Sequence, residues 1–204
     1  HSQTLLPMLD ELAKMTELDL DSVDAIAVAA GPGSFTGLRI GSATAKGLGL
    51  ALKKPLAEIP TVDALAYNLY DAKGLICPIM DARRNQVYTG IYRFEEHQLV
   101  TVEGQMAVPM TELISKLNER GEEVIFLGDG VPVFAQTIAE NLKVPYSFAP
   151  AHVNKQRAAA VAALGELYVK EGKTVTAMEH IPEYLRVSQA ERERAQRLKE
   201  EGKA

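Results

Sequence analysis

Cysteine is almost absent from this chain. Of 204 residues, only Cys77 is a cysteine, which excludes an internal disulfide and is typical of proteins kept in a reducing compartment. Because Cys77 falls within an apolar stretch, we expect a small buried side chain there rather than a reactive thiol.

Excess basic charge and long apolar runs are also missing. The formal net charge is -5, which argues against a free-standing nucleic-acid binder, because such proteins normally present a basic face. The longest apolar runs, such as residues 25–30, are far shorter than the roughly 18 residues of a membrane helix. We therefore expect a soluble cytoplasmic protein that contacts no membrane and that meets RNA only through a partner.

The polar side chains match no catalytic spacing. His97, His152 and His180 are too scattered to be metal ligands. Ser34 lies in Gly-Pro-Gly-Ser-Phe, which is not a Gly-x-Ser-x-Gly nucleophile elbow, and no histidine is placed to activate it. We therefore expect no metal site, no catalytic residue and no peptidase activity, and we assign Ser34 to a helix N-cap.

Apolar periodicity divides the chain into two halves. The first half predicts a helix over residues 2–15, a buried strand over 23–30, a helix over 35–52, a strand over 55–59, and a helix over 62–70 with Thr61 as its N-cap. The second half predicts strands over 75–80, 86–94 and 98–102, a helix over 111–119, a strand over 124–127, a helix over 133–142, a short extended segment over 144–148, and a helix over 158–170.

The two halves have the same element order once the three opening strands of the second are set aside. Alternating strands and helices favour mostly parallel sheets covered by helices. A repeated βββαβαβα order is that of the actin-like (ribonuclease H-like) α/β fold with two facing lobes. We assign residues 1–72 to a first lobe without its opening meander, 73–187 to a second lobe, and the charge-rich residues 188–204 to a C-terminal helix or tail. We expect that the chain begins inside the first lobe.

A glycine-rich run, residues 31–41, separates a predicted strand from a predicted helix. Its sequence is Gly-Pro-Gly-Ser-Phe-Thr-Gly-Leu-Arg-Ile-Gly. One interpretation is a turn whose backbone N–H groups bind an anion. The other is a tight turn that needs glycine for its dihedrals and packing, and neither a P-loop lysine nor a G-x-G-x-x-G spacing is present. The residues of this structural turn are Gly31, Gly33, Ser34, Gly37 and Gly41.

The helix over residues 35–52 is apolar or small on two opposite sides. Leu38, Leu48 and Leu52 can face a sheet, and each interior glycine costs about 1 kcal/mol relative to alanine, so packing must compensate. The outer side carries Ile40, Ala43, Gly47 and Leu50, flanked by the charged residues Arg39 and Lys46. Since a surface helix is normally polar on its outer side, this helix either is buried inside its own lobe or meets a helix of another subunit.

The first predicted helix favours the second alternative. Its apolar arc covers about half its circumference, wider than packing on one sheet requires. The residues of this arc that we assign to a partner-binding surface are Leu5, Leu6, Met8, Leu9, Leu12 and Ala13. From the second helix we assign Arg39, Ile40, Ala43, Lys46, Gly47 and Leu50 to the same surface. Two such helices side by side could pair with a similar patch as a four-helix bundle.

Three motifs resemble those of one family. The run at residues 31–41, the Asp-Ala-Arg-Arg run at 81–84 followed by Val-Tyr at 87–88, and the Pro-Glu-Tyr-Leu-Arg run at 182–186 are similar to signatures of the TsaB (YeaZ) proteins. The resemblance covers essentially the whole chain. One departure is the absence of the Asp-Thr-Ser or Asp-Thr-Ala strand with which family members begin.

The resemblance implies an actin-like scaffold subunit of the threonylcarbamoyl-transfer machinery for tRNA. Such a subunit forms a homodimer, or a heterodimer with the catalytic paralogue TsaD, through its first two helices, and works with the ATPase TsaE. ATP and metal are then expected on the partner subunits and not on this chain, and tRNA is contacted through the complex. The catalytic paralogue carries a His-x-x-x-His metal motif, where this chain has His1 followed four residues later by Leu5.

An independent actin-like ATPase or kinase is the alternative function. It would need a metal held by carboxylates and phosphate-binding loops from both lobes. The sequence shows neither a clear acidic pair nor the first of these loops.

Overall fold

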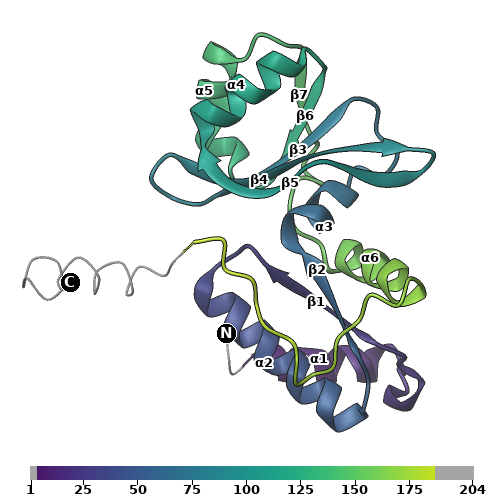
Figure 1. Ribbon diagram of the computed structural model, residues 1–204. Helices are drawn as coiled ribbons and strands as arrows, with labels where there is room; N and C mark the ends of the chain where they lie inside the picture. Colours follow the sequence, from purple (N-terminus) through teal and green to yellow (C-terminus); the bar gives the residue numbers. More distant parts are fainter. Residues whose placement is uncertain (1–3, 187–204) are drawn as a thin grey trace, which may run out of the picture.

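The structure is a computed structural model that describes residues 4–186. Figure 1 shows an α/β fold with two separate sheets, each covered by helices. The elements in chain order are α1 (Leu5–Met15), the 3-10 helix η1 (Leu20–Ser22), β1 (Ile26–Gly31), α2 (Phe35–Leu52), β2 (Leu56–Pro60), α3 (Thr61–Tyr67), β3 (Leu75–Asp81), β4 (Gln86–Glu95), β5 (Gln98–Pro109), α4 (Met110–Arg120), β6 (Val124–Leu127), α5 (Val131–Asn141), β7 (Tyr146–Phe148) and α6 (Ala158–Lys170). The tail predicted over residues 188–204 lies outside the described residues.

Among residues 4–186, no helix has both the length and the hydropathy needed to cross a membrane.

The larger sheet has five strands in the order β5-β4-β3-β6-β7. Strands β3, β4 and β5 form the predicted antiparallel meander, and β6 and β7 extend the sheet in parallel. Helices α4 and α5 cover one face through a core that includes Leu113, Phe126 and Ile138. The predicted element order is confirmed for this part of the chain. Strand β5 continues beyond its predicted end because it pairs with β4 along its whole length, from Gln98 to Pro109.

The smaller sheet consists of β1 and β2 in parallel, with Ile26 opposite Leu56. Val28 and Leu56 lie on the face that packs against α2. Ala27 and Ala57 lie on the other face, against α6, and α3 also packs there. Both faces are therefore covered, as the apolar run over residues 23–30 predicted.

Helix α6 packs differently from its predicted place. We assigned it to the second lobe within residues 73–187, but it contacts β1, β2 and α3. Gly165 permits the close approach, because a Cβ at this position would lie 2.6 Å from the Cβ of Ala27. Periodicity predicted the bounds of α6 but could not show which sheet it covers. The division of the chain at residue 72 stays a prediction.

The residues after α6 form a segment that we call the C-terminal strap, residues 174–186. Figure 1 shows it running across α2 (yellow). Val175 exchanges two backbone hydrogen bonds of 2.9 Å with Leu56 of β2, and the Glu183 N–H donates to the Ala30 carbonyl at 2.7 Å. The Gln105 side chain of β5 donates to the Glu183 carboxylate at 2.5 Å. The strap therefore connects the smaller sheet to the larger one.

The predicted N-cap of α3 is wrong. Pro60 occupies the N-cap position and Thr61 is the first helical residue. The Thr61 hydroxyl is buried and has no hydrogen-bond partner. An N-cap residue has non-helical dihedrals, and these belong to Pro60, with ψ 130°, so Thr61 lies one position too far along the chain to cap the helix.

Candidate partner-binding surface

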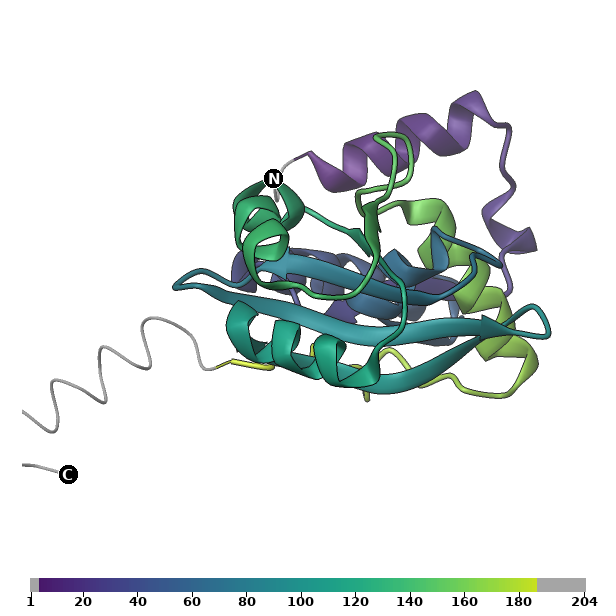
Figure 2. The same cartoon turned by 90° about the horizontal axis from the view of Figure 1, so that it is seen from above.

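Helix α1 exposes most of its apolar side chains. None of its residues is buried, and Met8 is 67% exposed. Pro7 is accommodated because it lies in the first turn, where it removes no intrahelical hydrogen bond. The helix ends where the Thr16 hydroxyl donates to the Leu12 carbonyl at 2.8 Å. In the view of Figure 2, α1 lies along one side of the molecule, away from the larger sheet.

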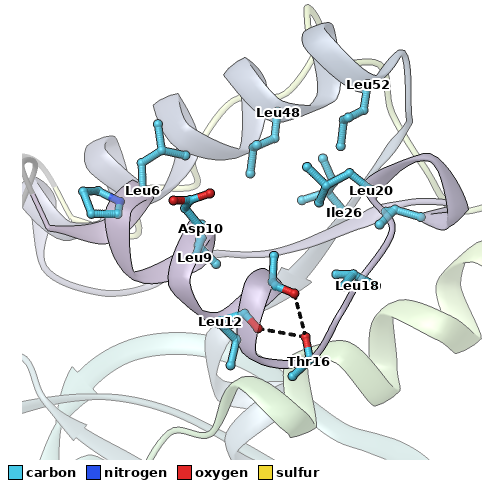
Figure 3. Close-up of a pocket in the computed structure, with 13 residues that line it drawn as sticks. Leu6, Leu9, Asp10, Leu12, Thr16, Leu18, Leu20, Ile26, Leu48 and Leu52 are labelled. Atoms are coloured by element: carbon cyan, nitrogen blue, oxygen red, sulfur yellow. Dashed lines mark hydrogen bonds between the residues drawn. The ribbon is translucent and has the colours of Figure 1, made fainter.

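A cavity of about 730 Å³ separates α1 from β1 and α2. Leucine and isoleucine side chains point into it from all three elements (Figure 3). From α1 they are Leu6, Leu9 and Leu12, with Ala13 beside them; from the other elements and the loop they are Leu18, Leu20, Ile26, Leu48 and Leu52. The α1 residues that we assigned to the partner-binding surface therefore do not all lie in the same environment. Most of its members face this cavity, whereas Leu5 and Met8 do not line it.

Most of the outer side of α2 is exposed in the described part of the chain. Ala43, Gly47 and Leu50 are exposed, Leu50 by 55%, and Ile40 is half-buried. No atom would lie within 4 Å of a Cβ added at Gly47. Among residues 4–186, α2 is therefore not buried on all sides, which goes against the alternative that it is enclosed by its own lobe.

Two of the three α2 leucines that we expected to face the sheet lie elsewhere. Leu38 is buried toward the sheet as expected, together with Ala45 and Gly49. Leu48 and Leu52, which we also expected to face the sheet, line the cavity beside α1. Helical spacing places these residues on one broad side, but it cannot separate a sheet-facing residue from a cavity-facing one.

The two charged residues predicted at the edge of the surface have partners within the chain. The Arg39 guanidinium lies 4.2 Å from the centre of the Phe35 ring, a cation–π contact. The Lys46 ammonium donates to the backbone carbonyls of His180 at 2.9 Å and Met178 at 3.4 Å. Lys46 therefore holds the strap against α2.

A buried polar cluster joins α2, β2 and the strap. His180, 1% exposed, lies with Nδ1 2.6 Å from Glu58 Oε1 and Nε2 2.9 Å from Ser42 Oγ. A hydroxyl, an imidazole and a carboxylate in this order are also the groups of a hydrolase triad. Ser42 is only 4% exposed and lines neither described cavity, so its hydroxyl is enclosed by protein in this structure. The cluster acts as a clamp on the strap.

Sequence reasoning missed this cluster. His180 was noted only for lacking metal-ligand spacing, and Ser42 was not singled out. The sequence did contain one indication that Ser42 is buried. Ser42 lies on the same side of α2 as Leu38, Ala45 and Gly49, which is the buried side. A polar residue at a buried phase requires a partner, but the sequence does not identify a partner 138 residues away.

The glycine-rich turn has a packing explanation. Gly31 has φ +130°, and a Cβ there would overlap the carbonyl oxygen of Glu183 in the strap. Ser34 is the N-cap of α2, and its hydroxyl accepts from the Gly37 N–H at 3.4 Å. These contacts support the tight-turn interpretation, and no residue of the turn lines either described cavity.

A second cavity, of about 560 Å³, lies among β1, α3 and α6. The partnerless Thr61 hydroxyl and the Arg157 side chain belong to residues that line it. Within residues 4–186, no group of three or more His, Cys, Asp or Glu side chains could hold a metal ion. The expectation that this chain binds no metal or nucleotide itself stays a prediction.

By its architecture, the chain is an α/β protein with two unequal sheets joined by a C-terminal strap. Residues 1–194 match the model of the TsaD family, tRNA N6-adenosine threonylcarbamoyltransferase. The tRNA threonylcarbamoyladenosine biosynthesis protein TsaB of Bacillus subtilis is 34% identical over 191 residues, covering 94% of this chain and 82% of that protein. TsaB of Haemophilus influenzae is 41% identical over 91 residues, covering 43% of this chain and 38% of that protein.

Solved structures agree with these relatives. YeaZ from Pseudomonas aeruginosa has a TM-score of 0.72 and 25% identity, covering 91% of this chain and 84% of that one. A second structure from that organism, described as similar to peptidase YEAZ, has a TM-score of 0.73 at 24% identity and shares the fold. The chain belongs to the TsaB (YeaZ) family of tRNA threonylcarbamoyladenosine biosynthesis proteins, which confirms the resemblance read from its motifs.

Proposed function

We propose that the chain is a non-catalytic subunit that binds and supports a TsaD-type catalytic paralogue. The paralogue transfers threonylcarbamoyl to the tRNA adenosine next to the anticodon. The main support is the exposed apolar surface on α1 and α2, which includes Met8, Ala43, Gly47 and Leu50. Exposed apolar patches on an otherwise polar protein are typical of protein–protein interfaces.

Family membership supports the remaining parts of the proposal. The chain adopts the actin-like two-lobe fold and forms a homodimer through the same surface when the paralogue is absent. ATP and metal are held by the partner subunits, a TsaE-type ATPase among them, and tRNA is contacted only through the complex. The complex works in the cytoplasm.

Substitutions on the outer side of α2 test this function. Ile40→Asp and Ala43→Arg each place a charge on the proposed contact, and a charge that is desolvated without a partner weakens association strongly. We expect the affinity for the TsaD-type paralogue, measured by calorimetry, to fall by about tenfold or more. The circular dichroism spectrum should stay close to that of the wild type, because Ala43 is exposed.

The matched control is Val133→Arg on α5. Val133 is 56% exposed and lies on the part of the molecule built on the larger sheet. It should leave paralogue binding unchanged. Wild-type affinity in both α2 variants would refute the proposal, and a collapsed spectrum in Ala43→Arg would show that this residue is needed for folding.

The cavity with Thr61 and Arg157 keeps one alternative function open, an independent nucleotide-binding enzyme. Thr61 offers a buried hydroxyl without a partner, and Arg157 a cation that could bind phosphate. Calorimetry with ATP and Mg²⁺ tests this alternative. Saturable binding that Arg157→Ala and Thr61→Val both weaken, together with ATP hydrolysis, would favour it over the scaffold role.

A further inference from the structure

The smaller sheet has an open edge along β1. Among residues 4–186, β1 pairs with β2 alone, and the strap reaches only the Ala30 carbonyl near its end. The Ile26 N–H donates to the Pro55 carbonyl, on the side of β2, at 3.0 Å. Because successive N–H groups of a strand point to opposite sides, those of Ala27 and Ala29 point away from β2. Such an unpaired edge is a template for a further strand.

The two described cavities lie on the two faces of this edge. The cavity of about 730 Å³ lies on the side of α1 and α2 and is lined by Ile26. The cavity of about 560 Å³ lies on the side of α3 and α6 and is lined by three consecutive residues, Ala27, Val28 and Ala29. Since successive side chains point to opposite faces, this second cavity reaches the edge of the strand. Native interiors hold few voids larger than a water molecule, so two spaces of this size indicate room for an additional strand.

The larger sheet contains the same arrangement with this place filled. There, α4, β6, α5 and β7 follow one another as α1, β1, α2 and β2 do in the smaller part. Strand β3 lies in parallel on the other edge of β6, with Leu75 opposite Val124. The open edge of β1 is the corresponding place, where no described strand pairs.

Strand β3 shows which side chains an occupant of this place must carry. Cys77 and Ile79 belong to the core that includes α4 and α5, whereas Ile76 and Met80 belong to the core beside α3. All four side chains are buried, as is typical of parallel strands that are covered on both faces. A strand on β1 would likewise send apolar side chains into both cavities, so one occupant accounts for both.

Helices α1 and α4 differ in burial as this comparison predicts. Both have 11 residues, and counted from their first residues Leu9 and Leu12 of α1 correspond to Ile114 and Leu117 of α4. Ile114 and Leu117 are buried in the core with β3 and β4. Leu12 is 57% exposed, and both α1 leucines line the larger cavity. The apolar side of α1 therefore matches a sheet that continues beyond β1.

We infer that an apolar β-meander occupies the open edge of β1, with one strand parallel to β1 and side chains that fill both cavities. The occupant is the stretch of the same polypeptide that directly precedes α1. In the larger part, β5 ends at Pro109 and α4 begins at Met110, so the counterpart of β5 would lead into α1 without a loop. Its length would be roughly that of residues 75–109, which hold β3, β4 and β5.

The inference does not depend on the proposed function. Ala43, Gly47 and Leu50 on the outer side of α2 line neither cavity, so the meander leaves that side to a partner. It does compete with the alternative function, because it fills the space beside Thr61 and Arg157 in which a nucleotide would bind.

A graft tests the inference. The opening residues of Bacillus subtilis TsaB, up to the counterpart of Leu5, are joined to Leu5 of this chain, and the graft is compared with the original chain. Hydrogen exchange followed by NMR should show the Ala27 and Ala29 amides at least about tenfold more protected in the graft. The melting temperature should rise by about 5 °C or more, and the fluorescence of the apolar dye ANS should fall because the apolar cavities are filled.

Matched substitutions show whether both cavities are filled. Leu12→Glu in the larger cavity and Ala162→Glu in the smaller one change exposed residues, so each should leave the melting temperature of the original chain nearly unchanged. In the graft each should remove most of the gain, because the charge would then be buried without a partner. The control Leu50→Glu, on the outer side of α2, should have little effect in either protein.

Three results would overturn the inference. The first is a graft that melts no later than the original chain and leaves the Ala27 and Ala29 amides unprotected. The second is a graft in which Leu12→Glu and Ala162→Glu cost no more than they do in the original chain. The third is protection of these two amides in the original chain by the purified TsaD-type paralogue, or by a higher concentration of the chain itself, because another molecule would then occupy the edge.

Discussion

At the scale of single residues, a buried hydrogen bond links the two parts of the fold. The Tyr92 hydroxyl on β4 donates to the Asp63 carboxylate in the first turn of α3 at 2.6 Å. Tyr92 is fully buried, and burial raises its pKa. Burial also raises the pKa of Asp63, against the opposing effect of the hydrogen bond from Tyr92. The hydrogen bond from Tyr92 therefore replaces part of the hydration that the Asp63 carboxylate loses on burial.

Tyr92→Phe removes this donor and leaves the carboxylate desolvated. The free energy of unfolding at neutral pH should fall by about 1–3 kcal/mol, the cost of an unsatisfied buried polar group. The pKa of Asp63 in the folded protein should rise further, which carboxyl-carbon NMR can follow. Urea denaturation measures the stability.

The pH dependence of this variant has a definite sign. A raised pKa of Asp63 in the folded protein means that folding favours the protonated carboxyl group. The contribution of Asp63 to the free energy of unfolding is therefore fully present below the unfolded-state pKa, and it is lost as pH rises through the folded-state pKa. Tyr92→Phe should therefore lose more stability between acid and neutral pH than the wild type. Asp63→Asn removes the titration and should flatten this difference. Equal stability of Tyr92→Phe and wild type at all pH values would contradict the account.

At the scale of elements, α2 shows how two glycines in one helix can have opposite effects. Alanine is favoured over glycine in a helix interior by up to about 1 kcal/mol. Gly47 has open space around it, whereas a Cβ at Gly49 meets Leu56, Ala177 and the Lys54 carbonyl. Alanine at Gly47 should therefore gain the full helix propensity, whereas at Gly49 this gain is opposed by steric overlap of the added Cβ.

We expect Gly47→Ala to raise the free energy of unfolding by about 0.5–1 kcal/mol. Gly49→Ala should lower it by about 1–3 kcal/mol, because buried Leu56 and the strap must move. Chemical denaturation of both variants measures the difference. A Gly49→Ala variant as stable as the wild type or more stable would contradict the close packing of Leu56 and Ala177 on α2.

The Thr176–Glu179 turn of the strap predicts a second pH effect. The backbone and side-chain hydrogen bonds from Thr176 lower the pKa of Glu179. A lowered folded-state pKa gives a contribution that is present above the ordinary carboxyl pKa and is lost as pH falls through the lowered value. The protection factor of the Thr176 amide, which is its exchange rate relative to an unstructured amide at the same pH, should therefore fall only on strong acidification. The variant Glu179→Ala should show little protection of this amide at any pH, and a well-protected amide in that variant would contradict the turn.

The bounds of several elements could be predicted from sequence, whereas their long-range partners could not. The glycine run and the helical period predicted α2 over residues 35–52, and the alanine-rich run predicted α6 over 158–170. The sheet that α6 covers, the extra length of β5 and the Ser42–His180 contact all depend on residues far away in the chain. Local propensity has no information on these pairings.

At the scale of the whole molecule, the strap makes the two parts dependent on each other. It pairs with β2, contacts β5 through Gln105 and Glu183, and crosses the helix proposed to bind the partner. The apolar outer side of α2 could be predicted from its period, but the contribution of the strap required the tertiary structure.

The central claim is that a second polypeptide covers the outer sides of α1 and α2. Multi-angle light scattering of the purified chain, alone and mixed with the TsaD-type paralogue, tests it most directly. We predict a mass of twice the 22.2 kDa chain for the protein alone, a one-to-one heterodimer in the mixture, and a monomer for Ala43→Arg in both cases. A wild-type protein that stays monomeric at all concentrations and does not join the paralogue would contradict the account.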